Sequence, residues 1–309
     1  MKGIIGLMKR FLVLIFLVIS LTACKPGTPP EPLATHLPST TPTLVEPTQT
    51  PTPLPPTLTP VPMAALVNGE GIPLAEFQAE LKRFKDSGTK LATDSTIDAN
   101  QTVLEDLIDQ LLLAQSAYAG GFTLDEAALQ ARIDQLATKV GGSQALEKWM
   151  SAHQYTPEEF RQSLKRSVAA AWMRDQIVSA VPSTAEQLHV RQILLYNSKQ
   201  AEDILTLLQS GQDFAKLAKQ YDPVTGGDLG WFPRGYLNVR ALEDAAFALQ
   251  PGEYSQVIQT PQGFHLIQVI ERDPQHPLSP EARLTLQEKA LAEWVQQRRE
   301  QSDIQILVP

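Results

Sequence analysis

Side chains that could do chemistry are sparse in this 309-residue sequence. It holds one cysteine, Cys24, so no disulfide can form within the chain. The histidines show neither HxxxH nor HEXXH spacing, so we expect no metal site and no cofactor. They are His36, His153, His189, His265 and His276.

His265 has the most informative surroundings of these. It lies in the apolar run Phe264–Ile270, which predicts a strand, and alternation places it on the same face as Ile267 and Val269. An imidazole there would be half-buried, and a hydrogen-bonding partner would fix its tautomer. Taken alone, this pattern favours a core histidine over a catalytic one.

A series of short motifs surrounds His265. In order they are Phe214-Ala-Lys-Leu-Ala-Lys-Gln220, Gly226-Gly-Asp-Leu-Gly-Trp-Phe232, Arg234-Gly235, Leu242-Glu-Asp-Ala-Ala-Phe-Ala-Leu249, Pro251-Gly-Glu253 and Gly263-Phe-His-Leu-Ile267. The series resembles the parvulin family of prolyl isomerases, over Gln187 to about Arg272. Within that resemblance a catalytic role for His265 becomes the favoured interpretation.

The resemblance implies a fold and a site. Parvulins form a four-stranded antiparallel sheet wrapped by helices, with a slot for the proline ring beside His265 and Asp222. A turn before Pro223 is an equally good interpretation of Asp222. The implied substrate-binding residues are Leu237, Leu242, Phe247, Trp231 and Phe232.

The expected reaction needs neither a nucleophile nor a metal. Resonance gives the amide a rotation barrier of about 18–20 kcal/mol. The twisted transition state has lost that resonance, so its carbonyl is less polar and its nitrogen more basic. An apolar slot with hydrogen bonds matched to the twisted amide would favour it.

The first strand departs from the family pattern. Parvulins usually carry a histidine just before Ile-Leu, and here that position is Gln192. His189, three residues earlier, should face the opposite side of the strand. Glutamine offers one hydrogen bond toward His265 but can neither protonate nor change tautomer. We therefore expect a preserved fold with reduced activity, and the catalytic candidates are His265, Gln192 and Asp222.

Strands and helices are both predicted around these residues, between positions 183 and 273. The pattern predicts strands at Leu188–Leu195, Ser255–Gln259 and Phe264–Ile270, and helices at Ala201–Gln209, Phe214–Gln220 and Leu242–Leu249. This order is typical of a small α/β domain.

Residues 64–181 follow a helical pattern, opened by a short hairpin with an Asn-Gly turn. We expect helices from Pro73 to about Lys85 and over Ile97–Ala119, Leu124–Val140, Ser143–His153 and Pro157–Ala180, two of them started by Thr123 with Glu126 and by Thr156 with Pro157. The arrangement Val67-Asn68-Gly69, Ile72, Phe77 and Leu81 resembles the N-terminal chaperone domain of extracytoplasmic foldases (PrsA/SurA-like).

The tail, residues 278–309, predicts a helix over Pro280–Gln301, capped by Ser279, and a strand at Ile304–Val308. The resemblance implies that it packs on the N-terminal helical domain, with the parvulin domain (183–273) inserted between. Leu291 and Trp294 would then be core residues. The predicted fold class is α+β.

The N-terminus predicts export and lipidation. Three basic residues precede the apolar run Phe11–Leu21, which is too short to span a bilayer comfortably, so residues 1–23 indicate a signal peptide. The run ends in Leu21-Thr22-Ala23-Cys24, which resembles a bacterial lipobox. The alternative is a short membrane anchor with an incidental cysteine. Residues 24–63 are rich in proline and threonine and indicate an extended tether.

The net charge excludes other classes of partner. The sequence holds 26 basic and 34 acidic side chains, and its net charge is −8. Nucleic-acid binding needs clustered Lys and Arg, which are missing, and the sign is wrong for electrostatic docking on anionic lipid.

The sequence therefore predicts a foldase that is lipid-anchored through Cys24 to the outer face of the cell membrane. It would isomerise Xaa-Pro bonds in unfolded exported polypeptides, and a homodimer is left open. Two rivals remain: a holdase chaperone whose parvulin domain lost turnover with Gln192, and a lipid-tethered scaffold or solute-binding lipoprotein. The repeated βαβ pattern of solute binders is missing.

Overall fold

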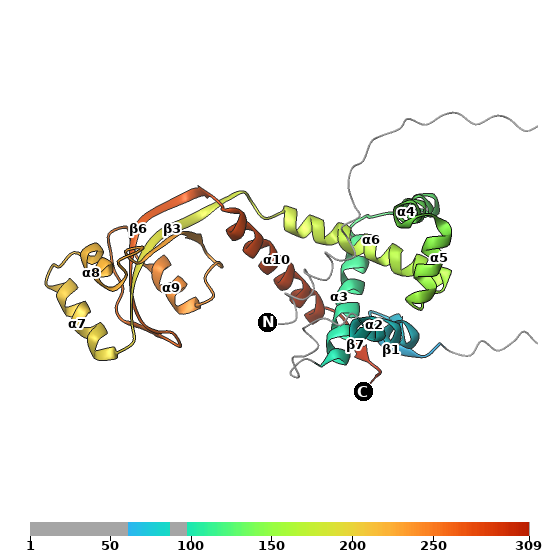
Figure 1. Ribbon diagram of the computed structural model, residues 1–309, viewed down its shortest axis with the longest axis horizontal. Coiled ribbons are helices and arrows are strands. Elements are labelled where there is room, and N and C mark those ends of the chain that lie inside the picture. Colours follow the sequence, from blue (N-terminus) through green and yellow to red (C-terminus); the bar gives the residue numbers. More distant parts are fainter. Residues whose placement is uncertain (1–60, 87–97, 309) are drawn as a thin grey trace, which may run out of the picture.

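The computed structural model describes residues 61–86 and 98–308. The predicted signal peptide, Cys24 and most of the tether lie outside these residues. Within them the chain forms a sheet-containing unit, built on a four-stranded sheet, and a helical unit, which also carries a small three-stranded sheet (Figure 1). The mixed α+β class predicted from the sequence is confirmed.

The sheet-containing unit is built on four antiparallel strands in the order β4-β3-β6-β5. This confirms the predicted four-stranded sheet. Its elements in chain order are β3 (Thr184–Leu195), α7 (Ser198–Gln209), α8 (Phe214–Tyr221), β4 (Asp228–Pro233), α9 (Arg240–Ala248), β5 (Ile258–Thr260) and β6 (Gly263–Pro277).

Alternation along the strands divides the unit into two cores, one on each face of the sheet. On one face Ile193, Leu195 and Leu266 pack with residues of α7 and α8. On the other, Ile267 and Val269 join residues of α9. His265 alternates in step with Ile267 and Val269 along β6, so its side chain lies on the same face of the sheet, the one covered by α9.

The central pair, β3 and β6, is longer than the sequence predicts. β3 begins at Thr184 rather than Leu188, and β6 continues to Pro277 rather than ending at Ile270. The two strands stay paired out to Thr184 and Pro277, with register shifts that absorb their irregularities. The extra length forms a two-stranded arm that leads to the helical unit (Figure 1).

The helical unit joins both ends of the described chain. Its elements are β1 (Met63–Val67), β2 (Glu70–Pro73), α2 (Leu74–Asp86), α3 (Ala99–Ala119), α4 (Glu126–Val140), α5 (Ser143–Ala152), α6 (Pro157–Ser179), α10 (Pro280–Glu300) and β7 (Ile304–Ile306). Asn68 and Gly69 both have positive φ, as a tight β1–β2 hairpin requires.

The helix starts follow from capping chemistry. Thr156 and Glu159 form a reciprocal capping box at α6, and Ser279 caps α10, both at the predicted starts. The predicted capping box of Thr123 with Glu126 is wrong, and α4 begins at Glu126 rather than at about Leu124. Asp125 is the N-cap and its carboxylate accepts a hydrogen bond from the Ala128 N–H, since an Asp directly before the helix caps as well as a threonine does.

The tail packs back on the N-terminal segment, as predicted. Leu291 and Val295 of α10 are buried with residues of α3 and α6, and Trp294 packs partly buried against them. β7 pairs antiparallel with β1, with Ala65 opposite Ile306. The sheet-containing unit is therefore an insertion between two segments of one helical unit.

A partly buried ion pair fastens α10 to α3. Arg299 contacts the Asp109 carboxylate through Nε, and its Nη2 donates to the Glu105 carbonyl at 3.1 Å. Asp109 is only 6% exposed. Burial raises the pKa of Asp109, and the opposing effect of Arg299 does not fully offset it.

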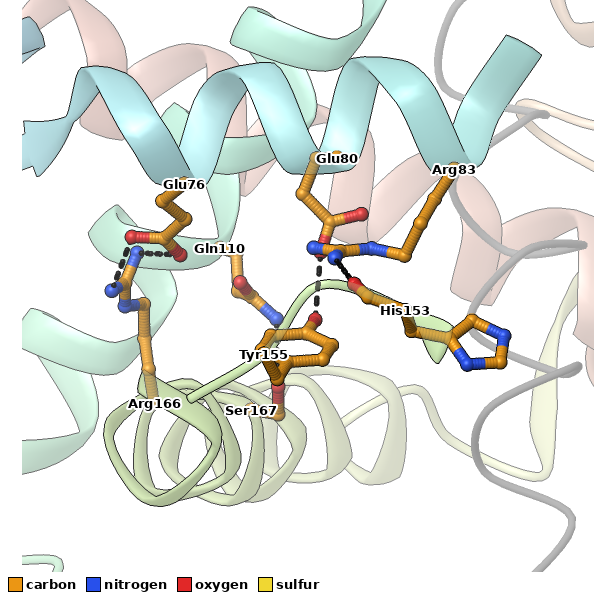
Figure 2. Close-up of polar contacts among 8 residues, drawn as sticks. All are labelled: Glu76, Glu80, Arg83, Gln110, His153, Tyr155, Arg166 and Ser167. Carbon is orange, nitrogen blue, oxygen red and sulfur yellow. Dashed lines mark hydrogen bonds and ion pairs between the residues drawn. The ribbon is translucent and has the colours of Figure 1, made fainter. Parts of the chain in front are cut away.

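Polar contacts also join α2 to α6 and to the loop that precedes it (Figure 2). Arg166 pairs with Glu76 at 3.0 Å, and the Tyr155 hydroxyl donates to Glu80 at 3.0 Å. Arg83 pairs with Glu80 and lies over the Tyr155 ring, 4.2 Å from its centroid. Burial, with Glu80 nearby, raises the pKa of Tyr155 to about 12, so its hydroxyl stays a donor at neutral pH.

None of the helices in the part of the chain that the structure describes is both long and apolar enough to cross a membrane.

We predict that Arg299→Ala destabilises the chain by about 3 kcal/mol at neutral pH, because it leaves the Asp109 charge buried without its partner. The deficit should shrink as the pH is lowered and Asp109 becomes protonated in the folded state. The raised pKa of Asp109 lets the folded state take up a proton first, which removes the buried charge. Urea unfolding followed by circular dichroism measures both effects.

The matched control is Arg283→Ala, an exposed arginine on the same helix, which should stay within about 0.5 kcal/mol of the parent. Equal losses in the two variants would show that the Asp109–Arg299 pair has no special role.

Candidate active site

The centre of the candidate site is a hydrogen-bonded pair on neighbouring strands. His265 on β6 is 4% exposed, and its Nδ1 lies 3.1 Å from Oε1 of Gln192 on β3. Strand alternation places His265 on the α9 face of the sheet. The antiparallel register puts Gln192 opposite Ile267, which lies two residues beyond His265. The structure thus brings together two of the three predicted catalytic residues.

Thr260 is a third member that sequence reasoning missed. Its hydroxyl lies 2.8 Å from His265 Nε2, and it also accepts the Gln262 N–H at 3.1 Å. The predicted strand ended at Gln259, whereas β5 ends at Thr260, paired with Gly263 at the turn into β6. One feature of the sequence could have pointed to Thr260. It is a hydroxyl-bearing residue five positions before His265, in two short strands joined by a tight turn.

The contacts of His265 suit a neutral ring protonated at Nδ1. With the Gln192 side-chain oxygen facing it, Nδ1 donates to that oxygen, and Nε2 accepts from the Thr260 hydroxyl, which also lies 3.4 Å from the Gly263 carbonyl oxygen. Burial lowers the pKa of His265, which favours the neutral ring. Burial and these two contacts therefore favour a neutral imidazole protonated at Nδ1.

Asp222 is engaged within its own loop. Its carboxylate accepts the backbone N–H groups of Val224 and Thr225, both at 3.1 Å, and the Thr225 hydroxyl. The bonds from the Thr225 hydroxyl and backbone lower the pKa of Asp222. This geometry matches the turn interpretation, and no contact with His265 or Gln192 is present among its hydrogen bonds.

The Asp222 loop nevertheless contacts the site through its last glycine. The Gly227 carbonyl accepts the Gln192 N–H at 2.7 Å. Gly227 has φ +75°, and a Cβ there would lie 2.0 Å from the Gln192 carbonyl oxygen, so only glycine fits. The loop thereby holds the Gln192 backbone at the point where its side chain turns toward His265.

Four of the predicted substrate-binding residues share one apolar cluster on the α9 face. Leu242, Phe247 and Phe232 are buried in it, and Leu237 packs against it partly exposed. The Phe232 and Phe247 rings meet edge to face with centroids 6.3 Å apart. The cluster contains Ile267 of β6, two residues beyond His265, and so borders the hydrogen-bonded pair.

Leu229 belongs to the same cluster and was not predicted. Gly230 pairs with Val190 while Asp228 pairs with Arg191, so Leu229 is the extra residue of a β-bulge. Gly230, with φ +70°, permits this kink. Bulges interrupt the two-residue period, and alternation from Phe232 alone places Leu229 on the wrong face.

Trp231 is not brought to this group. It follows strand alternation onto the opposite face, where its ring stacks on His276 with a centroid distance of 4.0 Å and on His189 at 5.5 Å. His189 also lies 2.9 Å from the Asp228 carboxylate. His189 is therefore turned away from His265, as strand alternation predicts.

A second group of polar side chains lies between α2 and α6. The charged groups between α2 and α6 bind one another (Figure 2). Within residues 61–86 and 98–308, no three His, Cys, Asp or Glu side chains gather closely enough to hold a metal ion.

Two family profiles match the chain, each over one unit. Residues 177–273 match the PPIC-type PPIase domain, and residues 56–174 match the SurA-like N-terminal domain. Over 233 residues the chain is 31% identical to the foldase protein PrsA of Caldanaerobacter subterraneus subsp. tengcongensis, a match covering 66% of this chain and 72% of the relative.

The chain belongs to the PrsA foldase family. Its inserted unit is a parvulin-type peptidyl-prolyl isomerase domain, and the N-terminal segment of its helical unit is a SurA-like N-terminal domain.

Further relatives match with different coverage. The PrsA of Geobacillus sp. is 43% identical over 98 residues, which are 30% of this PrsA-family chain and 35% of that relative. The solved peptidylprolyl isomerase PrsA of Bacillus cereus has 22% identity and a TM-score of 0.42, with coverage of 78% of this chain and 86% of that one.

We predict that His265 makes folding stability depend on pH. Its folded-state pKa lies below its ordinary value of 6.5, so in acid the unfolded chain binds the proton first. The contribution should be complete above about pH 6.5 and should be lost as the pH falls through the folded-state pKa. Urea unfolding of the parent and of His265→Gln, compared across pH, isolates this titration. Parallel stability curves would contradict the assignment of a buried neutral imidazole.

Proposed function

We propose that this PrsA-family protein is a lipid-anchored prolyl isomerase and chaperone for unfolded exported polypeptides. Family membership is established by sequence, and the observation that supports turnover is the neutral His265 held between Gln192 and Thr260 beside an apolar cluster. The predicted division into domains at 64–181, 183–273 and 278–309 is part of this proposal.

The chemistry follows from what rotation does to the amide. A planar Xaa-Pro bond is stabilised by resonance, and the twisted state has a less polar carbonyl and a more basic nitrogen. Leu229, Leu237, Leu242 and Phe247 would hold the proline ring in a dry environment, which disfavours the polar planar amide relative to the twisted one.

The imidazole network would orient rather than react. Because Gln192 and Thr260 contact both ring nitrogens of His265, the ring is held in position and neither nitrogen is left open toward a substrate. Turnover would then depend on a fixed site geometry and not on acid–base exchange. This gives Gln192 a workable role in the place of the usual histidine.

The same substitution supports a second candidate, a holdase that binds proline segments without turnover. Gln192 cannot adopt the second tautomer or the charge that a histidine offers. Both candidates keep the slot and the helical unit for client binding. They differ only in whether bound Xaa-Pro bonds are accelerated.

We predict that the parent isomerises Xaa-Pro peptides. His265→Ala should lower kcat/KM at least about tenfold, which corresponds to about 1.4 kcal/mol of lost transition-state stabilisation. Gln192→His should raise activity if the family pair is the better catalyst. The matched control is His189→Ala on the opposite face of β3, which should leave activity unchanged. A protease-coupled assay on a panel of Xaa-Pro peptides measures all four proteins.

The holdase candidate predicts different results in the same experiment. A folded parent without turnover that gains activity in Gln192→His would establish it. Suppressed aggregation of a refolding client without faster proline-limited refolding would support the same conclusion.

We also predict that Cys24 determines membrane attachment. In Cys24→Ala the protein should move from the membrane fraction to the soluble extracytoplasmic fraction and lose labelling by a fatty-acid analogue, because two or three acyl chains hold a protein firmly. Cell fractionation with metabolic labelling tests this. Equal labelling of parent and variant by the fatty-acid analogue would contradict lipidation at Cys24, and loss of labelling with unchanged partitioning would show that the apolar run before Cys24 also holds the chain.

A further inference from the structure

The loop between β4 and α9 is fastened by a buried carboxylate. Glu243, in the first half of α9, is 8% exposed. Its Oε1 accepts the Gly235 N–H at 2.8 Å, and its Oε2 accepts the Leu237 N–H at 3.1 Å. Each oxygen thus has one backbone donor, and bonds of this charge-assisted kind are about twice as strong as neutral ones.

The fastened loop carries an accessible wall of the predicted slot. Leu237 is partly exposed, whereas Leu242 and Phe247 in the same cluster are buried. Leu242 directly precedes Glu243 along α9. The carboxylate therefore fixes the Leu237 backbone relative to the helix that supplies the other side of the slot.

The outer side of the loop rests on the helical unit. Gly235 has φ +85°, and a Cβ placed on it would lie 3.4 Å from Leu286 Cδ2 and 3.3 Å from Lys289 Nζ of α10. The loop is thus held between α10 and Glu243. Without the carboxylate it would keep its outer contact and lose both inner hydrogen bonds, so the fold can survive while the wall shifts.

We propose that Glu243 is a positioning residue for prolyl isomerisation, holding the Gly235–Leu237 segment as one wall of the proline slot. The inference rests on the proposed function. Glu243 acts through Leu237 and does not touch the reacting amide. Glutamine is a poor replacement, because its NH₂ group would face a backbone N–H where the carboxylate offers an acceptor.

The test uses the full chain with Glu243→Gln and Glu243→Ala. The matched control is Glu253→Gln, which makes the same charge change and removes a bond to a backbone N–H, that of Gln250 at 2.8 Å, in a different turn. Three quantities are measured: kcat and KM on an Ala-Pro peptide, the Kd of that peptide by NMR titration, and amide exchange at Gly235 and Leu237.

Glu243→Gln should raise KM and Kd about tenfold, equivalent to about 1.4 kcal/mol, with kcat within about twofold of the parent. Exchange at Gly235 and Leu237 should quicken while the core strands stay protected. The control should match the parent. If Glu243→Ala fails to fold, Glu243→Gln decides alone.

An unchanged KM and Kd in Glu243→Gln would overturn the proposal, as would an equal effect in Glu253→Gln. A parent that binds the peptide without turnover would refute the isomerase function, and the Kd comparison would still decide the role of Glu243. A parent that binds no proline peptide would overturn both.

Discussion

The antiparallel pairing of β3 with β6 is the interaction on which the rest of the molecule depends. It aligns Gln192 with the histidine strand, so that an amide and an imidazole from distant parts of the sequence share one hydrogen bond. The same ladder separates the two cores and extends beyond them as the arm that carries the insertion. The pairing register of β3 with β6 therefore determines both the geometry of the site and the way the inserted domain is connected to the helical unit.

Burial of a polar ring near one end of this ladder sets the remaining constraints. An imidazole removed from water must keep its hydrogen bonds, and His265 finds one partner on each side, on β3 and β5. The glycine-rich loop in turn fixes the backbone of Gln192 through Gly227. The chemistry is therefore supported by backbone conformations in two loops as much as by the side chains that touch.

Features with a regular period could be predicted from the sequence, and features that break a period could not. Helices with capping residues and the strand faces of His265 and His189 follow from local rules. Leu229 was missed because a β-bulge reverses its face, and Trp231 was grouped with Phe232 although neighbouring residues in a strand point apart. Thr260 was missed because its role exists only once β5 and β6 are paired.

The pairing of β1 with β7 also has a consequence for the order of assembly. The first strand of the helical unit meets its partner in the last residues of the described chain, whereas every strand of the insertion finds its partners between Thr184 and Pro277. Contacts that close long stretches of chain form late, because closing them costs more entropy. The isomerase domain can therefore mature while the chaperone domain still awaits its C-terminal strand, and a ribosome-bound or truncated chain would carry the first without the second.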